Sequence, residues 1–300
     1  MNDVTNGRVR DFVGYGRNPP DPRWPGGAHL AINFVNNYEE GGEFAVPDGD
    51  PASETGLTEG STAPAKGRDL AAESMFQFGS RVGFWRLFRM FERRGLPCTI
   101  FGVAKAMERN PEVCAAIREA GWDVVGHGLR WEMHHALDEA TERAHIVEAA
   151  DIIERCVGHR PQGWYCRYAP SVNTRRILAE QGFAYDSDSY DDELPYWVQV
   201  NGKPQLVIPY SITHNDVRFP RQGLTSGDEY FAYIRNAIEC ALHEDRPCML
   251  SFGLHNRIIG HAGRAAGLAK LLDWIGTQKG IWVARRADIA AHWRKEHPPK

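Results

Sequence analysis

The sequence predicts an α/β protein with a parallel sheet that is closed or nearly closed into a barrel. Short apolar runs typical of buried strands alternate at least six times with segments of helical periodicity. Polar residues gather directly after the strands, which places them on the one rim where α/β barrels keep their active sites. The 300 residues contain no internal repeat and no break in composition, so we expect one domain over residues 1–300.

The first half of the chain opens with a polar arm, rich in Pro and Gly, that we expect to lie over the domain at residues 1–27. An apolar stretch over residues 28–35 predicts the first strand. Residues 44–69 have few apolar side chains and form a long loop that we expect near the active site. Residues 84–94 carry apolar side chains at helical spacing and end at Gly95, as an amphipathic helix does. The other expected elements of this half are strands over residues 97–103 and 122–125 and helices over residues 112–120 and 137–156.

The second half of the chain alternates in the same way. A short strand runs from residue 161 into a polar loop, and Asn173 or Thr174 can cap the helix that follows. We expect further strands over residues 183–186, 206–210, 247–254 and 281–284, and helices over residues 173–178, 230–243, 264–277 and 287–295. Helical crossovers between consecutive strands make the strands parallel.

Charge and composition exclude several classes of protein. The net charge is −4 without a block of like charges, which argues against a nucleic-acid-binding surface and against a patch for membrane surfaces. No apolar run has the length of a secretory signal core or of a membrane span, so we expect a cytoplasmic protein. The six cysteines form no Cys-x-x-Cys pair, and no base can be assigned that would make Cys166 a nucleophile.

A Gly-His-Gly turn at residues 126–128 is the strongest functional signal in the chain. It ends the apolar run of residues 122–125, so His127 lies at the carboxyl end of a predicted strand with open space around it. We predict that His127 takes part in chemistry or binds a metal. The alternative is a histidine whose two ring nitrogens are hydrogen-bonded by the backbone of a tight loop.

Acids, imidazoles and a guanidinium follow successive strands, at Glu39, His127, Arg167, Asp188, Asp216 and His255. Such a set suits hydrolysis of a polarised carbonyl, in which one group activates water, another protonates the leaving nitrogen and donors hold the oxyanion. We predict that Glu39 accepts the proton of water and that His127 and His255 orient the water or protonate the leaving nitrogen. A structural carboxylate at Glu39 and a hydrogen-bonded strand-end histidine at His255 are the alternatives.

The predicted substrate-binding residues are Asn37, Arg130, Trp131, Tyr165, Arg167, Asp188, Asp192, Asn215 and Asp216. Arg167 can pair with substrate carbonyls through its planar fork, or form a salt bridge to Asp188 or Asp192. Asn215 and Asp216 can recognise ring N–H groups, or form an ordinary turn. Trp131 can stack on a planar heterocycle, or fill the barrel mouth.

Several short stretches together resemble a known family: residues 14–20, 37–43, 78–81, 127–131, 173–176, 190–197, 215–216 and 253–255. Over almost its whole length the chain resembles the polysaccharide deacetylases, the carbohydrate esterase 4 or NodB homology family. It is more closely similar to the cofactor-independent bacterial allantoinases of purine catabolism, which form a branch of that family. The resemblance implies a distorted (β/α) barrel of the NodB type and a homotetramer.

The chain departs from the deacetylase pattern at the metal site. The family holds a divalent metal with an aspartate and two histidines, whereas the matching positions here are Asn37, Glu39 and, for the second histidine, Trp131. One imidazole and one carboxylate fall short of the three ligands of a catalytic zinc, so we expect no cofactor. The alternative is zinc held by Glu39, His127 and His134, with Glu132 as a further candidate ligand.

These features predict a hydrolase that opens a C–N bond in a small cyclic amide or ureide. Allantoin is the first candidate, and a cyclic imide is another, because the loop at residues 164–174 is bulkier than its allantoinase counterpart. A metal-dependent N-deacetylase of carbohydrate or peptidoglycan is the second reading. An inactive barrel used for binding or assembly is the third.

Overall fold

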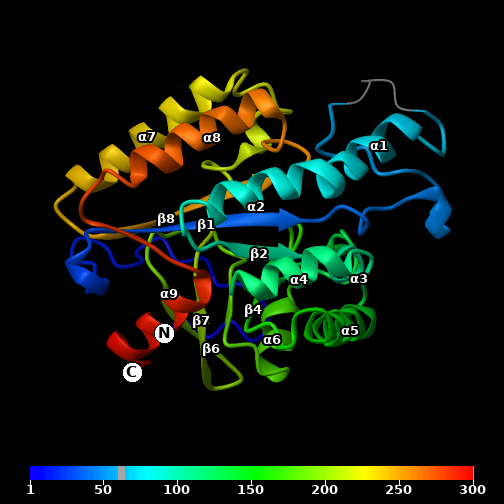
Figure 1. The fold of residues 1–300 in the computed structure, drawn as a ribbon. Helices are drawn as coiled ribbons and strands as arrows, with labels where there is room; N and C mark the ends of the chain where they lie inside the picture. The colour runs from blue at the N-terminus through cyan, green and yellow to red at the C-terminus, as the bar shows by residue number, and fades with distance from the viewer. Residues whose placement is uncertain (60–64, 300) are drawn as a thin grey trace.

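The computed structural model describes residues 1–59 and 65–299, which form one curled, mostly parallel sheet surrounded by helices (Figure 1). Its strands are β1 (Leu30–Tyr38), β2 (Thr99–Gly102), β3 (Asp123–Gly126), β4 (Gly163–Trp164), β5 (Tyr185–Asp186), β6 (Tyr196–Val200), β7 (Lys203–Val207), β8 (Cys248–His255) and β9 (Ile281–Val283). They lie in the order β6-β7-β5-β4-β3-β2-β1-β8, and β9 pairs with β1. Each of the pairs is parallel except the hairpin of β6 and β7.

The predicted NodB-type distorted barrel is confirmed, with a sheet that curls but does not close by regular pairing. The path ends at β8 on one side and at β6 on the other. Irregular segments span the gap: Met249 donates its N–H to the carbonyl of Glu193 at 2.9 Å, and Asn215 forms a β-bridge with Gly253. The prediction of an all-parallel sheet was wrong for the antiparallel strand β6, which begins inside the acidic and aromatic run of residues 187–197.

The helices are α1 (Leu70–Phe78), α2 (Phe84–Glu92), α3 (Ala104–Glu108), α4 (Pro111–Glu119), α5 (Glu139–Val157), α6 (Thr174–Glu180), α7 (Gly227–His243), α8 (Ala262–Ile275) and α9 (Arg286–Glu296). Shorter turns are η1 (Pro25–Gly27), η2 (Val46–Asp48), η4 (His134–Ala136) and η5 (Asp216–Arg218). Figure 1 shows α7 and α8 side by side over β1 and β8, with α3, α4 and α5 grouped further along the sheet. Helices α1 and α3 are additional to those that the sequence predicted.

Alternation along β1 separates an outer face from an inner face. Leu30, Ile32 and Phe34 pack among the surrounding helices, whereas Ala31 and Val35 belong to a second apolar cluster inside the barrel. The strand extends three residues beyond the predicted end, through Tyr38. Since odd-numbered residues of β1 face inward, Asn37 and Glu39 follow on the inner side at the rim.

The end of the barrel opposite this rim is filled by side chains from the chain termini. Trp24 of the arm and Ile289 and Trp293 of α9 are buried in the inner cluster. The guanidinium of Arg286 is fully buried and donates to Asn33 Oδ1 at 2.9 Å, among several other oxygens. One end of the barrel is therefore plugged, and the carboxyl ends of the strands remain for function.

The polar arm lies over the domain, as predicted. Asp3 forms a β-bridge with Gln199, and Val4 packs against strands β6 and β7. The indole N–H of Trp24 donates to the carbonyl of Cys248 at 3.0 Å. Within the described parts of the chain, no helix is long and apolar enough to cross a membrane.

A short π-helix, η3 (Gly79–Gly83), here called the π-turn, joins α1 to α2 and lies against the loop that follows β8. Such turns are frequent at functional sites. A Cβ at Gly83 would overlap the backbone carbonyl of Asn256, and one at Gly79 would come within 2.6 Å of the Glu40 carboxyl carbon. Both glycines therefore permit a close approach between this turn and the strand-end loops.

We expect Gly83→Ala to lower the free energy of unfolding by about 1–3 kcal/mol, because the added methyl group must displace backbone atoms of the loop at Asn256. Urea unfolding monitored by circular dichroism measures the change. Gly263→Ala in α8 is the control: its Cβ meets nothing within 4 Å, so stability should be unchanged or rise by up to about 1 kcal/mol. Equal stability of the Gly83 variant and the unchanged protein would contradict the close approach.

Candidate active site

Glu39, His127 and His255 converge at the open rim from three different strand ends. The Oε1 atom of Glu39 lies 3.2 Å from Nε2 of His127 and 3.5 Å from Nε2 of His255. The register explains the convergence, since Asn37 of β1 is paired with His255 of β8, and β1 is joined through β2 to β3. All three side chains are buried, so the predicted catalytic residues form one cluster.

His127 has its tautomer constrained by the backbone. Its Nδ1 lies 2.7 Å from the carbonyl oxygen of Tyr165, which can only accept, so Nδ1 carries a proton. Nε2 of His127, which faces Glu39, therefore either carries a second proton that Glu39 accepts or is unprotonated. Gly128 adopts φ +99°, and a Cβ there would come within 2.6 Å of the Arg130 carbonyl, so the turn requires glycine.

His255 is held by Asp216, which accepts from the ring Nδ1 at 2.6 Å and from the backbone N–H of His255 at 2.7 Å. Burial by itself would lower the pKa of His255, but the negative charges of Glu39 and Asp216 raise it to about 9. At neutral pH this ring is therefore an imidazolium. Its Nδ1–H donates to Asp216, and its Nε2–H faces Glu39.

Glu39 is a buried carboxylate that stays ionised. Burial would raise its pKa, but the charges of Arg257 and His255 outweigh burial and hold the pKa well below its ordinary value. Arg257 Nη1 lies 2.7 Å from Oε2 of Glu39, an ion pair outside hydrogen-bonding geometry, so Oε2 has no hydrogen-bond donor among the described residues. The charge of Arg257 therefore holds the Oε2 side of the carboxylate, and Oε1 is the oxygen that faces both histidines.

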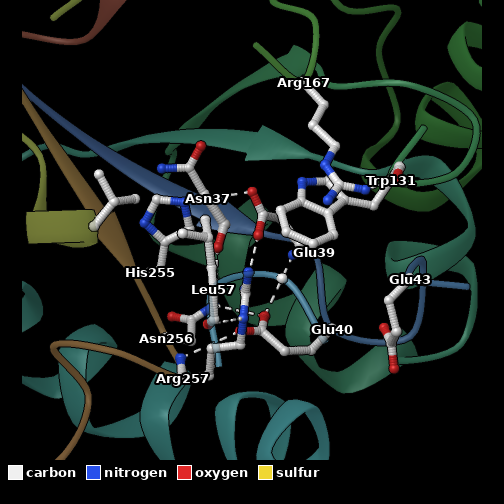
Figure 2. A network of polar contacts seen from close by, with 12 residues as sticks. Asn37, Glu39, Glu40, Glu43, Leu57, Trp131, Arg167, His255, Asn256 and Arg257 are labelled. Carbon is white, nitrogen blue, oxygen red and sulfur yellow. Dashed lines mark hydrogen bonds and ion pairs between the residues drawn. The ribbon is translucent and has the colours of Figure 1, made fainter. Parts of the chain in front are cut away.

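Arg257, Glu40 and Asn256 complete the network, although the sequence did not predict them as site residues. Figure 2 shows Arg257 between the carboxylates of Glu39 and Glu40. Glu40 accepts from the backbone N–H of Arg257 and from Nδ2 of Asn256, both at 3.2 Å. Burial and the neighbouring Glu39 raise the pKa of Glu40, while Arg257 opposes them. The signal was present in the spacing, because Arg257 lies two residues beyond His255 at the same strand end.

Arg167 lies over Trp131 on the same side of the site (Figure 2). The guanidinium carbon is 3.5 Å from the ring centroid, and Nη1 donates to the Trp131 carbonyl at 2.7 Å. The salt-bridge partner of Arg167 is Glu54, at 2.7 Å, and not Asp188 or Asp192, the partners given as the alternative to substrate binding. Glu54 belongs to the long loop at residues 44–69, so the described part of that loop does lie at the site; residues 60–64 of the loop fall outside the described chain.

Two more of the predicted substrate-binding residues, Tyr165 and Asn37, lie beside the catalytic cluster. The ring of Tyr165 stacks on His127, with centroids 5.2 Å apart, and its hydroxyl bonds the Tyr190 hydroxyl at 2.8 Å. Asn37 donates to the Leu254 carbonyl at 3.1 Å.

Asp216 and Asn215 are held by the protein itself. Both oxygens of Asp216 accept from His255, an arrangement that orients that ring. That Asp216 also recognises substrate N–H groups stays a prediction. Asn215 donates to the Tyr210 hydroxyl at 3.2 Å, and its Oδ1 accepts from the Val217 N–H at 3.0 Å.

Three other predicted residues are engaged elsewhere. Arg130 pairs with Asp50 at 2.7 Å and is not joined to the Glu39 cluster. Asp188 accepts from the Cys166 N–H at 2.9 Å; burial and Asp186 raise the pKa of Asp188 to about 7. Asp192 accepts from the backbone N–H of Leu194 at 3.0 Å. The partners of Arg130 and Asp188 lie 80 and 22 positions away along the chain, so the spacing of the sequence could not reveal them.

The residues at the rim do not fit the divalent metal that the deacetylase pattern contains. His134 is turned to Glu142 at 3.1 Å, and Glu132 is paired with His145 at 2.8 Å, so neither completes a site with Glu39. Within residues 1–59 and 65–299, no group of three or more His, Cys, Asp and Glu side chains is arranged to hold a metal ion. A cation on the Oε2 side of Glu39 would meet the guanidinium of Arg257.

Comparisons with known proteins agree with this architecture. The family model described as Polysaccharide deacetylase matches residues 68–185. A Schizosaccharomyces pombe protein classed with the polysaccharide deacetylases is 35% identical over 317 residues, covering 97% of this chain and 99% of its own.

Two solved structures are similar over nearly the whole length. A "probable Polysaccharide deacetylase" from Pseudomonas aeruginosa PAO1 superposes with a TM-score of 0.94 at 46% identity, covering 98% of this chain and 100% of that chain. PuuE allantoinase superposes with a TM-score of 0.93 at 45% identity, covering 98% and 99%.

We expect Asp216→Asn to lower the pKa of His255 from about 9 towards its ordinary 6.5, because one of the two charges that stabilise the imidazolium is removed. NMR titration with ¹⁵N-labelled histidine measures the shift. The folded pKa lies above the unfolded one, so the stability that the protonated ring adds is fully present below pH 6.5 and is lost as pH rises through about 9. In the variant this loss should move to lower pH.

Asp273→Asn removes a remote carboxylate that pairs with Arg94 and serves as the control. An unchanged titration of His255 in the Asp216 variant would show that Asp216 does not set its charge.

Proposed function

The chain belongs to the polysaccharide deacetylase family and is a hydrolase of the carbohydrate esterase 4 type, and we propose that it opens a C–N bond in a small cyclic amide or ureide. Allantoin is the first candidate and a cyclic imide the second. The observation that carries the proposal is the pairing of an ionised, unprotonated Glu39 with a protonated His255, whose nearest atoms are 3.5 Å apart. Similarity to PuuE allantoinase over nearly the whole chain supports the same substrate class.

The reaction begins with proton transfer from water to Glu39. As the O–H bond breaks, the water oxygen forms a bond to the carbonyl carbon of the substrate, and the carbonyl electron pair moves to the oxygen. Although its low pKa makes Glu39 a weak base, the carboxylate is ionised, and its Oε1 faces Nε2 of both His127 and His255, so we assign Oε1 as the atom that receives this proton. His127 orients the water through Nε2, since its Nδ1 proton is held by the Tyr165 carbonyl.

Collapse of the tetrahedral intermediate breaks the C–N bond. The electron pair returns from the oxyanion, and the departing nitrogen takes the Nε2 proton of His255, which Asp216 has held in the correct tautomer. The enzyme is then left with a neutral His255 and a protonated Glu39. Transfer of the proton over the 3.5 Å between them restores the starting state.

Substrate binding is assigned to the residues around this cluster. Arg167 presents a planar guanidinium to substrate carbonyls, with Trp131 stacked beneath it. Tyr165 and Asn37 flank the catalytic histidines.

We further expect a cytoplasmic homotetramer that acts in purine catabolism. This expectation follows from the resemblance and from the composition.

A metal-dependent N-deacetylase of carbohydrate or peptidoglycan is the second candidate. It is favoured by the family of the chain and by the description of the Pseudomonas aeruginosa relative. Both candidates hydrolyse a C–N bond beside a carbonyl, so the substrate and the response to chelators distinguish them. An inactive barrel used for binding would turn over neither class of substrate.

Turnover of allantoin, hydantoin and succinimide, before and after exhaustive chelation, tests the proposal. We expect at least one ring to be opened, with activity that survives chelation. Glu39→Gln and His255→Asn should each lower kcat by about 10²–10⁴-fold, because each removes a proton-transfer group. Activity on an N-acetylated sugar oligomer that is lost on chelation and restored by zinc would favour the deacetylase instead.

The pH profile gives a separate test of His255. We expect kcat/KM to fall above pH about 9, because the protonated ring that donates to the leaving nitrogen is then lost. In Asp216→Asn this basic limb should shift to lower pH by about one unit or more. A basic limb that stays in place in the variant would assign the proton donor to another residue.

A further inference from the structure

The site contains a buried cation that the proposed reaction has not yet used. Arg257 is 4% exposed and lies two residues beyond the end of strand β8, which carries His255. Burying a charged guanidinium is costly unless its charge and its donors are matched. The contacts that offset this cost indicate what the residue does.

Three kinds of contact fix the guanidinium of Arg257 in one place. Its charge faces Glu39 at 2.7 Å and Glu40 at 3.4 Å. Its planar group lies over the rings of Phe76 and Trp131, at 4.5 and 4.9 Å from their centroids. Its Nε donates to the carbonyl of Leu57 in the long loop at 3.2 Å. A guanidinium held by charge, by stacking and by the backbone cannot swing away during a reaction.

One donor of Arg257 is left over. Its Nη2 is buried and has no hydrogen-bond partner among the described residues. The same is true of Arg167 Nε and Trp131 Nε1 beside it. Buried donors without partners are rare because each one costs about 1–3 kcal/mol. Three of them lie beside an ionised carboxylate, where the oxygens of a bound molecule can supply the missing acceptors.

We propose that Arg257 provides the fixed positive charge of this active site: it pairs with Glu39, and its free Nη2–H donates a hydrogen bond to the substrate carbonyl oxygen as that oxygen becomes negative. The inference rests on the proposed amide hydrolysis. When water adds to the carbonyl carbon, the electron pair on the oxygen is stabilised by the fixed guanidinium; when the C–N bond breaks, the pair returns and the nitrogen leaves with the His255 proton. Arg257 thus supplies the positive charge for which the rim has no fitting metal site.

Glu40 is the positioning residue for this cation. It binds both the backbone N–H and the Nη1 of Arg257, and Asn256 holds its second oxygen. The π-turn supports the arrangement, because the missing side chain at Gly79 leaves the space that the Glu40 carboxylate fills.

The decisive comparison is Arg257→Gln against Arg257→Lys, measured on whichever ring the wild type opens. We expect Arg257→Gln to lower kcat by about 10²–10³-fold with KM changed by less than about threefold, because the donor acts on the oxyanion and not on the ground state. Arg257→Lys retains the charge and should recover part of this loss. Arg175→Lys is the matched control, since Arg175 forms a part-buried bidentate pair with Asp186 outside the site, and its kcat should stay within about threefold.

A kcat of Arg257→Gln within about threefold of the wild type would overturn the inference while leaving the proposed function standing. If Arg257→Gln fails to fold by circular dichroism, Arg257→Lys decides alone, with an unchanged kcat as the contrary result.

Calorimetric titration with Zn²⁺ provides a readout that needs no substrate. We expect that Zn²⁺ does not bind at Glu39, because the guanidinium occupies the Oε2 side of this carboxylate. The titration curves of the wild type and of Glu39→Gln should therefore be the same. Saturable binding that depends on Glu39 would mean that a metal can displace Arg257, and would overturn the inference. Absence of turnover on every ring, by contrast, counts against the proposed function alone.

Discussion

The ion pair between Glu39 and Arg257 is the interaction on which the rest of the site depends. A carboxylate buried at the rim of a barrel would ordinarily take up a proton, because burial disfavours its charge. The guanidinium at 2.7 Å and the imidazolium of His255 reverse this outcome and keep Glu39 ionised. The charge of His255 depends in turn on Glu39 and Asp216, so the protonation states of these residues are set together.

The fold provides the geometry for this set of charges through strand alternation and register. Asn37, Val125 and Met249 lie on the inner side of β1, β3 and β8, and the same alternation carries Glu39, His127 and His255 to the inner rim. At the other end Arg286 and α9 plug the barrel. The polar groups of the rim are therefore backed by apolar side chains, which strengthens each charge interaction among them.

Loops distant in sequence complete the site by covering its two arginines. Glu54 pairs with Arg167, and the Leu57 carbonyl accepts from Arg257, so a four-residue stretch of the long loop contacts both cations. Trp131 lies against both guanidinium groups. The fixed positive charge at the rim of this family fold thus comes from the side chains of Arg167 and Arg257. This accords with the acid–base chemistry proposed for a small cyclic substrate.

The sequence by itself determined the strand and helix alternation, the rim location of Glu39, His127 and His255, and the family, because periodicity and strand-end polar residues are local signals. It did not reveal β6, α1 or α3, whose apolar patterns are short or lie within polar surroundings. Nor could it show that Asp216 accepts a hydrogen bond from His255, that Glu54 pairs with Arg167, or that Arg257 pairs with Glu39. These pairs join residues 39 to 218 positions apart along the chain, and only the curled sheet brings them within 2.7 Å. Partner choice among buried charges is decided by tertiary distance, which no spacing in the sequence encodes.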